Sequence, residues 1–130
     1  MLDVEVFGER LAPDAPAPAE VARLCELAAA SRGVQSGHVA VEFVSAARIA
    51  ELNRLHRGKA GPTDVLSFPV DGPGGSEPRE IGDIVICPAH TEDLGEAIVH
   101  GMLHLLGMDH ERDDGEMLAL QDELLRRAAP

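Results

Sequence analysis

The sequence predicts one α+β domain in which helices pack on a small mixed β-sheet of about four strands. Its 130 residues match the usual size of a single domain, about 100–150 residues. A hydrophobic share of 45 % is typical of a globular chain that builds a core. Segments with strand-like and helix-like spacing follow one another in the order β-α-β-α-β-β-α-α. We therefore expect residues 1–130 to form a single domain.

Four segments have the alternation or the β-rich composition of strands. They are residues 2–7, 39–43, 63–70 and 80–87. Pro69 has no backbone N–H, which limits the third segment to a strand end or an edge position. Residues 71–78 are rich in Gly and Pro, so we expect a plain hairpin connection between the last two strands.

Four further segments carry apolar residues at helical spacing. They are residues 19–31, 46–57, 92–106 and 114–128. Ser45 and Gly58 suit the two ends of the second helix, and we assign its inward face to Ile49, Leu52 and Leu55. The third helix is apolar on most of its faces, so we expect it to be buried.

The last helix has a start signal in the sequence. Asp113 is followed three positions later by Glu116, the spacing of a capping box, so we expect Asp113 to be the N-cap. Met117, Leu120 and Leu124 recur at helical spacing and form the predicted inward stripe.

Charge and composition disfavour several classes of function. With 11 Lys and Arg against 23 Asp and Glu, the net charge of −12 opposes non-specific nucleic-acid binding, which depends on cationic side chains. The chain has no Trp, no Tyr and three Phe, so few rings are available to stack on bases. No apolar run approaches the roughly 18–20 residues needed to cross a bilayer, and no secretory signal is present. We therefore expect a cytoplasmic protein with no membrane partner.

Neither cysteine points to a disulfide or a thiolate metal site. Cys25 and Cys87 lie far apart in the chain, and neither belongs to a Cys-x-x-Cys pair. We interpret both as small buried hydrophobic residues.

Three of the six histidines fall within the segment HGMLHLLGMDH. His100 and His104 are four residues apart, so a helix places both imidazoles on one face, close enough to bind one ion. Gly107 can adopt a positive φ and end the helix, which lets His110 return as a third nitrogen ligand. Three imidazoles without a fourth protein ligand leave a coordination position open, as in catalytic zinc sites. The alternative is three unrelated histidines, which the combined spacing disfavours.

The spacing H-x-x-x-H-x-x-G-x-x-H also occurs in a large class of zinc metalloproteases. In those enzymes a glutamate follows the first histidine and acts as the general base. Here that position is Gly101, which disfavours peptide hydrolysis. The remaining histidines, His38, His56 and His90, lack ligand spacing, and we interpret them as surface or strand residues.

Two motifs together resemble a known family. The segment HGMLHLLGMDH resembles the signature of the YbeY family of rRNA-maturation metallo-endoribonucleases. The upstream segment LNRLHRGKAGPTDVLSFPV is similar to the family's second motif, in which an arginine-glycine-lysine segment leads into a strand. The strand EIGDIVIC also matches, so the resemblance spans about residues 37–125.

The resemblance implies a single-strand-specific endoribonuclease that acts in small-subunit rRNA 3′-end maturation and ribosome quality control. It implies that His100, His104 and His110 hold one zinc ion, although three imidazoles also suit other divalent transition metals. Its implied partners are small-subunit rRNA and the ribosome, with ribosome-associated proteins as further candidates and no DNA. By motif position, Arg57 is the family's functional arginine, and its guanidinium could contact the scissile phosphate.

Local charge supports that role for Arg57, and two other functions stay open. Residues 46–60 have a local net charge of +3 within an acidic chain, which suits phosphate contact at one place. Arg57 could otherwise be a surface arginine that favours a helix C-terminus. The alternative functions are a metallohydrolase of another substrate, including a peptide, and a non-catalytic ribosome assembly factor with a bound metal.

Two acidic residues near the motifs have local explanations. Asp109 could orient a metal-binding imidazole or shape the turn before His110, and we favour the turn. For Asp64, beside Thr63, we expect a role in fixing the entry of the third strand. One departure from the family concerns residues 89–98: this segment is shorter than usual, so the helix that carries His100 should begin near Thr91.

Overall fold

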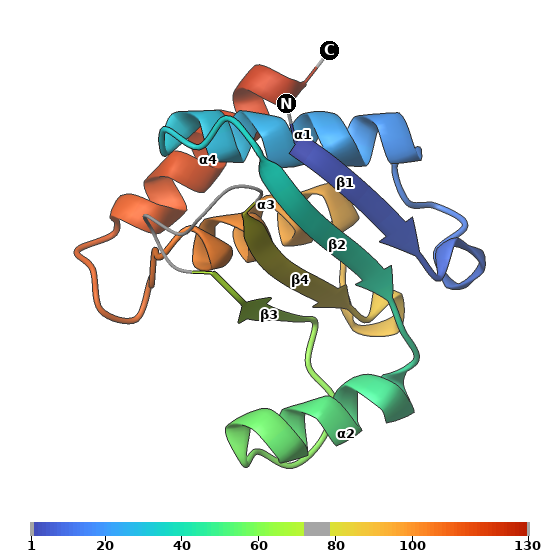
Figure 1. Ribbon diagram of the computed structural model, residues 1–130. Coiled ribbons are helices and arrows are strands. Elements are labelled where there is room, and N and C mark those ends of the chain that lie inside the picture. The colour runs from blue at the N-terminus through green and yellow to red at the C-terminus, as the bar shows by residue number, and fades with distance from the viewer. Residues whose placement is uncertain (1, 72–78, 130) are drawn as a thin grey trace.

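The strands form one mixed sheet of four. The computed structural model describes residues 2–71 and 79–129, so the predicted hairpin connection at 72–78 lies outside the described residues. The strands are β1 (Leu2–Phe7), β2 (Gly37–Phe43), β3 (Val65–Pro69) and β4 (Glu80–Ile86), in the order β1-β2-β4-β3 (Figure 1). β2 is parallel to both β1 and β4, and β3 is antiparallel to β4. The predicted mixed four-strand sheet is confirmed, and β3 with its Pro69 is an edge strand.

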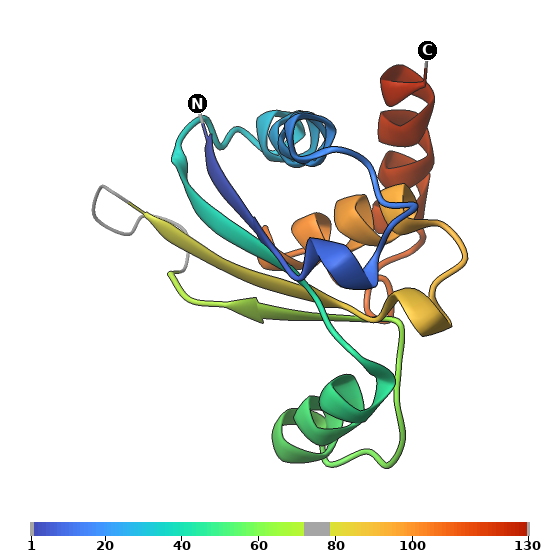
Figure 2. The same cartoon turned by 90° about the vertical axis from the view of Figure 1, so that its right-hand side faces the viewer.

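Helices cover both faces of this sheet. They are α1 (Pro18–Ser31), α2 (Ala46–Arg57), α3 (Leu94–Leu105) and α4 (Glu116–Ala128), with short 3-10 turns at Glu9–Leu11 and Pro88–His90. α1 and α3 lie on one face and α4 packs beside them, whereas α2 lies on the opposite side (Figure 2). Among the residues that the structure describes, none of these helices has the length and apolarity needed to span a bilayer.

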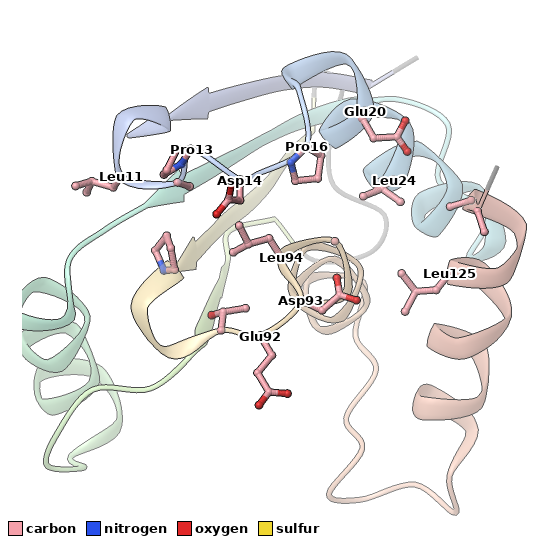
Figure 3. A pocket seen from close by; sticks show the side chains of 16 residues that line it. Leu11, Pro13, Asp14, Pro16, Glu20, Leu24, Glu92, Asp93, Leu94 and Leu125 are labelled. Atoms are coloured by element: carbon pink, nitrogen blue, oxygen red, sulfur yellow. The ribbon is translucent and has the colours of Figure 1, made fainter.

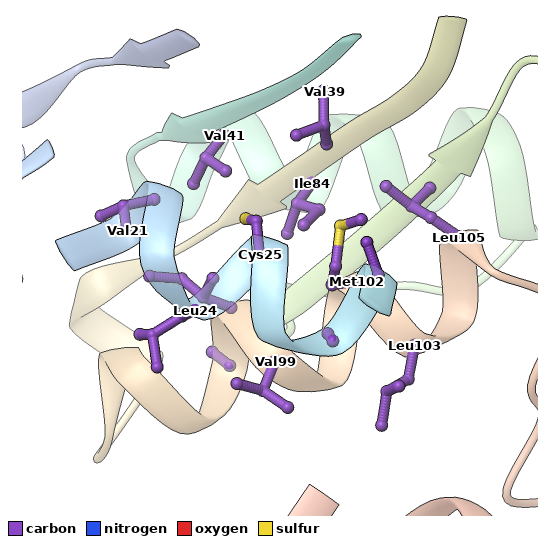
Figure 4. Packing of buried hydrophobic residues seen from close by; sticks show 14 of the residues in the cluster. Val21, Leu24, Cys25, Val39, Val41, Ile84, Val99, Met102, Leu103 and Leu105 are labelled. Atoms are coloured by element: carbon purple, nitrogen blue, oxygen red, sulfur yellow. The ribbon is translucent and has the colours of Figure 1, made fainter. Parts of the chain in front are cut away.

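The main core lies between the sheet and the α1/α3 layer (Figure 4). It joins apolar side chains of α1, the central strands and α3, for example Leu24, Val41 and Met102. Cys25 is fully buried here, and burial raises its pKa to about 12; Cys87 is buried in a smaller cluster under α2. Both thiols are free, which confirms their interpretation as hydrophobic residues.

α3 is buried on most of its faces, as predicted, and it packs unusually close to the sheet at Gly101. A Cβ at this position would lie 2.6 Å from Ile84 Cγ2 and 3.2 Å from Ser67 Oγ. The Ser67 hydroxyl donates a hydrogen bond of 2.9 Å to the Gly101 carbonyl. Position 101 therefore faces β3 and β4, with no room for the glutamate that a peptidase carries there.

Both C-terminal helices begin later than predicted. α3 starts at Leu94 because Asp93 has extended backbone and its Oδ1 accepts the Glu96 N–H at 3.0 Å. The N-cap of α4 is Gly115, with φ +101°, so the assignment to Asp113 was wrong. The Asp113 carboxylate still accepts the N–H groups of Gly115 and Met117, each at 2.9 Å, from outside the helix.

The inward face of α2 was also partly mispredicted. Its N-cap and C-cap are Ser45 and Gly58, as expected, but Leu55 is 58 % exposed. Ile49 and Asn53 are the buried residues of this helix. The Asn53 Nδ2 donates to the Gly61 carbonyl at 3.0 Å and so fastens the following loop. His56 follows Ile49 by seven positions and shares its side of the helix.

His38 links three strands through two glutamates. Its Nδ1 lies 2.8 Å from the Glu80 carboxylate on β4, and its Nε2 lies 2.6 Å from Glu5 Oε1 on β1. These two contacts, with Glu80 the stronger, outweigh the opposing effect of burial and raise the pKa of His38. The charged imidazole therefore stabilises the fold fully when the pH is below the pKa of His38 in the unfolded state, which is near 6.5. This stabilisation is lost as the pH rises through the higher pKa of His38 in the folded state.

We accordingly expect His38→Gln to lower the free energy of unfolding by up to about 1 kcal/mol at pH 5.5, because the glutamates are largely exposed. The difference should shrink by pH 8.5. Urea unfolding of both proteins at the two pH values measures this, with His90→Gln as the control. An equal loss at both pH values would contradict a contribution from the charged imidazole.

Candidate metal centre and active-site cleft

The structure brings the three histidines of the sequence motif together. His100 and His104 lie one turn apart on α3, and the chain turns at Gly107, where φ is +95°, so that His110 returns to them. One ring nitrogen from each residue lies within 4.8 Å of the others, and all three side chains are half-buried. This group could hold a metal ion.

Hydrogen bonds fix the orientation of two of the rings. His100 Nδ1 lies 2.8 Å from the Gln121 Oε1, and His104 Nδ1 lies 3.0 Å from the Met108 carbonyl. Because both partners are acceptors, each Nδ1 carries a proton, and in the neutral form of each ring the lone pair is therefore on Nε2.

The inward-facing nitrogens meet the requirement for a cation. The Nε2 atoms of His100 and His104 lie 3.1 Å apart, and none of the residues that the structure describes forms a hydrogen bond with the buried Nδ1 of His110. Burial, followed by the two neighbouring imidazoles, lowers the pKa of His104, which favours the neutral form that ligates metals. Lone pairs that converge in this way are well matched to a divalent ion.

The histidines open into a cleft of about 830 Å³ that runs along the edge strand β3. His56 and Arg57, from the end of α2, also line this cleft. Arg57 is exposed, and within residues 2–71 and 79–129 its guanidinium has neither a hydrogen bond nor an ion pair. The cleft therefore combines three convergent imidazoles with an arginine available to an anionic ligand.

Comparison with known proteins identifies the family. The family model described as Endoribonuclease YbeY matches residues 14–129. The chain belongs to the YbeY family. Membership supports an endoribonuclease role, and it confirms the resemblance noted in the two sequence motifs.

Similar YbeY proteins cover nearly the whole chain. An endoribonuclease YbeY from Rubrobacter xylanophilus is 41 % identical over 128 residues, spanning 94 % of this chain and 93 % of the relative. One from Macrococcus caseolyticus is 36 % identical over 145 residues, spanning 96 % and 94 %. The solution structure of TM1509 from Thermotoga maritima has a TM-score of 0.56 and 27 % identity, covering 96 % of this chain and 88 % of that one.

Acidic residues of the YbeY motifs act locally, as predicted. Asp109 Oδ1 accepts the Glu111 N–H at 2.9 Å, and its carbonyl accepts N–H groups of the following turn, so it shapes the path to His110. Asp64 Oδ1 accepts the Val65 N–H at 2.8 Å and the Thr63 hydroxyl at 3.2 Å, which fixes the entry to β3.

The other three histidines lie in different surroundings. His38 pairs with glutamates, as described above, and His90 is exposed on the turn before α3. His56 is exposed but also lines the histidine cleft, where its ring lies edge-on to Phe68.

A second hollow, of about 570 Å³, lies between α1, α3 and the end of α4 (Figure 3). Its polar side chains include Asp14, Glu20, Glu92 and Asp93, and it contains no residue of the histidine cluster. Carboxylates repel phosphate, so this hollow does not suit the chemistry that the YbeY family performs.

Gln121 is a site residue that the sequence did not reveal. Its side chain is buried on α4 and accepts a hydrogen bond from His100 Nδ1. Met117, Leu120 and Leu124 pack toward the core as predicted, and Gln121, four residues after Met117, is buried beside them. The only sequence signal for this role was that Gln121, a residue with an amide side chain, lies at helical spacing from the apolar residues Met117 and Leu124.

We expect Gln121→Leu to weaken metal affinity by about 10- to 100-fold, because the leucine cannot hold the His100 ring and tautomer. The apolar replacement should leave the fold intact. Competition with a colorimetric zinc chelator measures the affinity for zinc. The control is Asp122→Ala, which changes an exposed residue on the same helix. Gln121→Glu is a second variant, which keeps a hydrogen-bond acceptor for His100. Unchanged affinity in Gln121→Leu would remove this role.

Proposed function

We propose that this protein is a metal-dependent endoribonuclease that cuts single-stranded RNA. In this proposal His100, His104 and His110 hold one zinc ion, or another divalent transition metal, and Arg57 contacts the scissile phosphate. The observation that carries it is the convergence of the inward ring nitrogens at the cleft, 3.1 Å apart for His100 and His104. Membership of the YbeY family supports RNA as the substrate.

The three imidazoles determine which chemistry a bound metal ion would supply. His100, His104 and His110 would hold an ion through three nitrogen donors, a donor set typical of catalytic sites. A divalent metal bound by them would polarise a phosphoryl oxygen and lower the pKa of water at the site. Hydrogen bonds from Nδ1 of His100 and His104 keep these donors oriented before substrate arrives.

Arg57 supplies positive charge to the lining of the cleft. A guanidinium can donate two parallel hydrogen bonds to phosphate oxygens, and its stabilisation is largest for charge that develops during the reaction. Arg48, in the first turn of α2, pairs with Glu51, whereas Arg57 remains available. On a chain of net charge −12, such a local contact explains phosphate binding better than a broad basic surface does.

The packing of α3 disfavours peptide hydrolysis as the alternative. Gly101 occupies the position of the general base in the related zinc metalloproteases, and a side chain there would collide with Ile84. A divalent ion held by the three histidines would supply Lewis-acid chemistry toward a phosphodiester without a carboxylate at this position.

We further propose that the protein acts in the cytoplasm on small-subunit rRNA, in 3′-end maturation and ribosome quality control. Binding to the ribosome, or to ribosome-associated proteins, would bring the RNA to a protein whose overall charge repels it. The resemblance of both sequence motifs to the YbeY family supports this assignment.

Metal removal and restoration test the proposal. We expect purified protein to cleave a labelled single-stranded RNA, to lose this activity after dialysis against a chelator and to regain it with one equivalent of zinc. A duplex of the same sequence should stay intact. If zinc-loaded protein leaves RNA uncut, both free and within small-subunit particles, the role of a non-catalytic assembly factor is favoured instead.

A further inference from the structure

The cleft continues past the histidines to the other face of the sheet. Side chains alternate along β3, so Ser67 points to α3, where it binds the Gly101 carbonyl, and Phe68 points to the α2 side. Residues on both sides line the same cleft. A chain bound at the histidines can therefore pass over the edge of β3 and reach the α2 side.

An aromatic pair lies on that second side. The His56 and Phe68 rings have centroids 4.9 Å apart and meet edge to face, with an interplanar angle of 65°. Phe68 is half-buried against the small core under α2, which holds its ring, and His56 is exposed beside it. The chain has three phenylalanines and no Trp or Tyr, and one of these few rings lines the cleft.

We infer that Phe68 and His56 form a stacking site for one nucleobase of single-stranded RNA, next to the phosphate that Arg57 contacts. The inference rests on the proposed function and adds a subsite to it. His56, Arg57 and Phe68 all line the same cleft, so the cation and the rings are accessible to one bound chain. Aromatic faces bind bases of any sequence, which suits an enzyme selective for single strands, because bases in a duplex are already stacked.

The test removes the base and the rings separately. The substrates are a series of short single-stranded RNAs. Each RNA lacks one base, and the abasic ribose lies at a different position around the cut in each member of the series. Wild-type protein should lose about 5- to 150-fold in kcat/KM at one flanking position, the range expected for one base-aromatic stack. His56→Ala and Phe68→Leu should be less active than wild type on intact RNA. On the RNA that lacks the sensitive base, both variants should be as active as wild type.

Matched variants control for the fold and for the rings. Phe68→Leu keeps an apolar side chain against the core, His56→Ala changes an exposed residue, and His56→Phe restores a ring and should restore activity. The control variants are His90→Ala and Phe7→Leu, which change exposed aromatic residues outside the cleft. Both should have the activity of wild type. The inference is overturned if no single position is sensitive to base loss, or if the defects of His56→Ala and Phe68→Leu persist on abasic RNA.

A binding measurement separates this inference from the proposed function. Fluorescence anisotropy gives the affinity of His104→Ala protein for intact and abasic RNA without cleavage. If the wild-type protein cuts no RNA but base loss weakens binding only when both rings are present, the stacking site stands and the endoribonuclease proposal falls. If cleavage occurs and base loss changes neither binding nor rate, the endoribonuclease proposal stands and the stacking site falls.

Discussion

His104→Ala is expected to abolish metal binding and RNA cleavage together while the fold persists. The ring is half-buried, its polar contacts are Nε2 of His100 and the Met108 carbonyl, and it packs against the rings of His100 and His110. Removal of one of three protein ligands should cost about a quarter to a third of the roughly 10–16 kcal/mol that structural zinc sites provide. That loss corresponds to about 60-fold to several thousandfold in affinity.

The zinc content of purified protein and single-turnover RNA cleavage measure the two effects of His104→Ala. His90→Ala is the matched control, because it removes an exposed imidazole outside the cleft. Thermal unfolding checks that the variant is folded. Full zinc content in His104→Ala would contradict the ligand assignment, and equal cleavage by wild type and variant would point to a contaminating nuclease.

Arg57→Ala is expected to lower kcat/KM for RNA by about 10²- to 10³-fold, the usual effect of removing one preorganised donor to a developing charge. Metal content should not change, because Arg57 does not belong to the group of three histidines that could hold the ion. Arg57→Lys should recover little activity, since an ammonium group cannot make the paired hydrogen bonds of a guanidinium.

Steady-state cleavage of labelled single-stranded RNA measures the effect of Arg57→Ala. Arg54→Ala is the matched control: it removes an exposed cation from the same last turn of α2 at a position that does not line the cleft. If both variants lose activity equally, the effect of Arg57 is one of general charge. If neither loses activity, Arg57 does not contact the reacting phosphate.

The histidine cluster could be predicted because its geometry is local. All three residues fall within eleven positions, where helical spacing and the conformation of Gly107 determine how the rings meet. The strand and helix segments were likewise set by local periodicity. Their ends were less accurate: Asp93 delays the start of α3, and Gly115 displaces Asp113 as the N-cap of α4.

Long-range packing limited the rest of the prediction. Gln121 reaches His100 across 21 positions, and no local pattern specifies how α4 packs on α3. On α2, Leu55 was assigned inward from its hydrophobicity, yet Asn53 is buried because its amide bonds the Gly61 carbonyl. The cleft itself depends on sheet order, which inserts β4 between β2 and β3 and leaves β3 at the edge.

The hydrogen bond between Gln121 and His100 makes the C-terminal helix an energetic partner of the histidines. Coupling free energies are reciprocal, so an ion that holds the His100 ring in place also holds α4 against α3. Opening of α4 would release the Gln121 amide and weaken the ion's hold by the same factor. Loading of the metal site should therefore protect the backbone amides of α4 against hydrogen exchange, although none of them lies in the cleft.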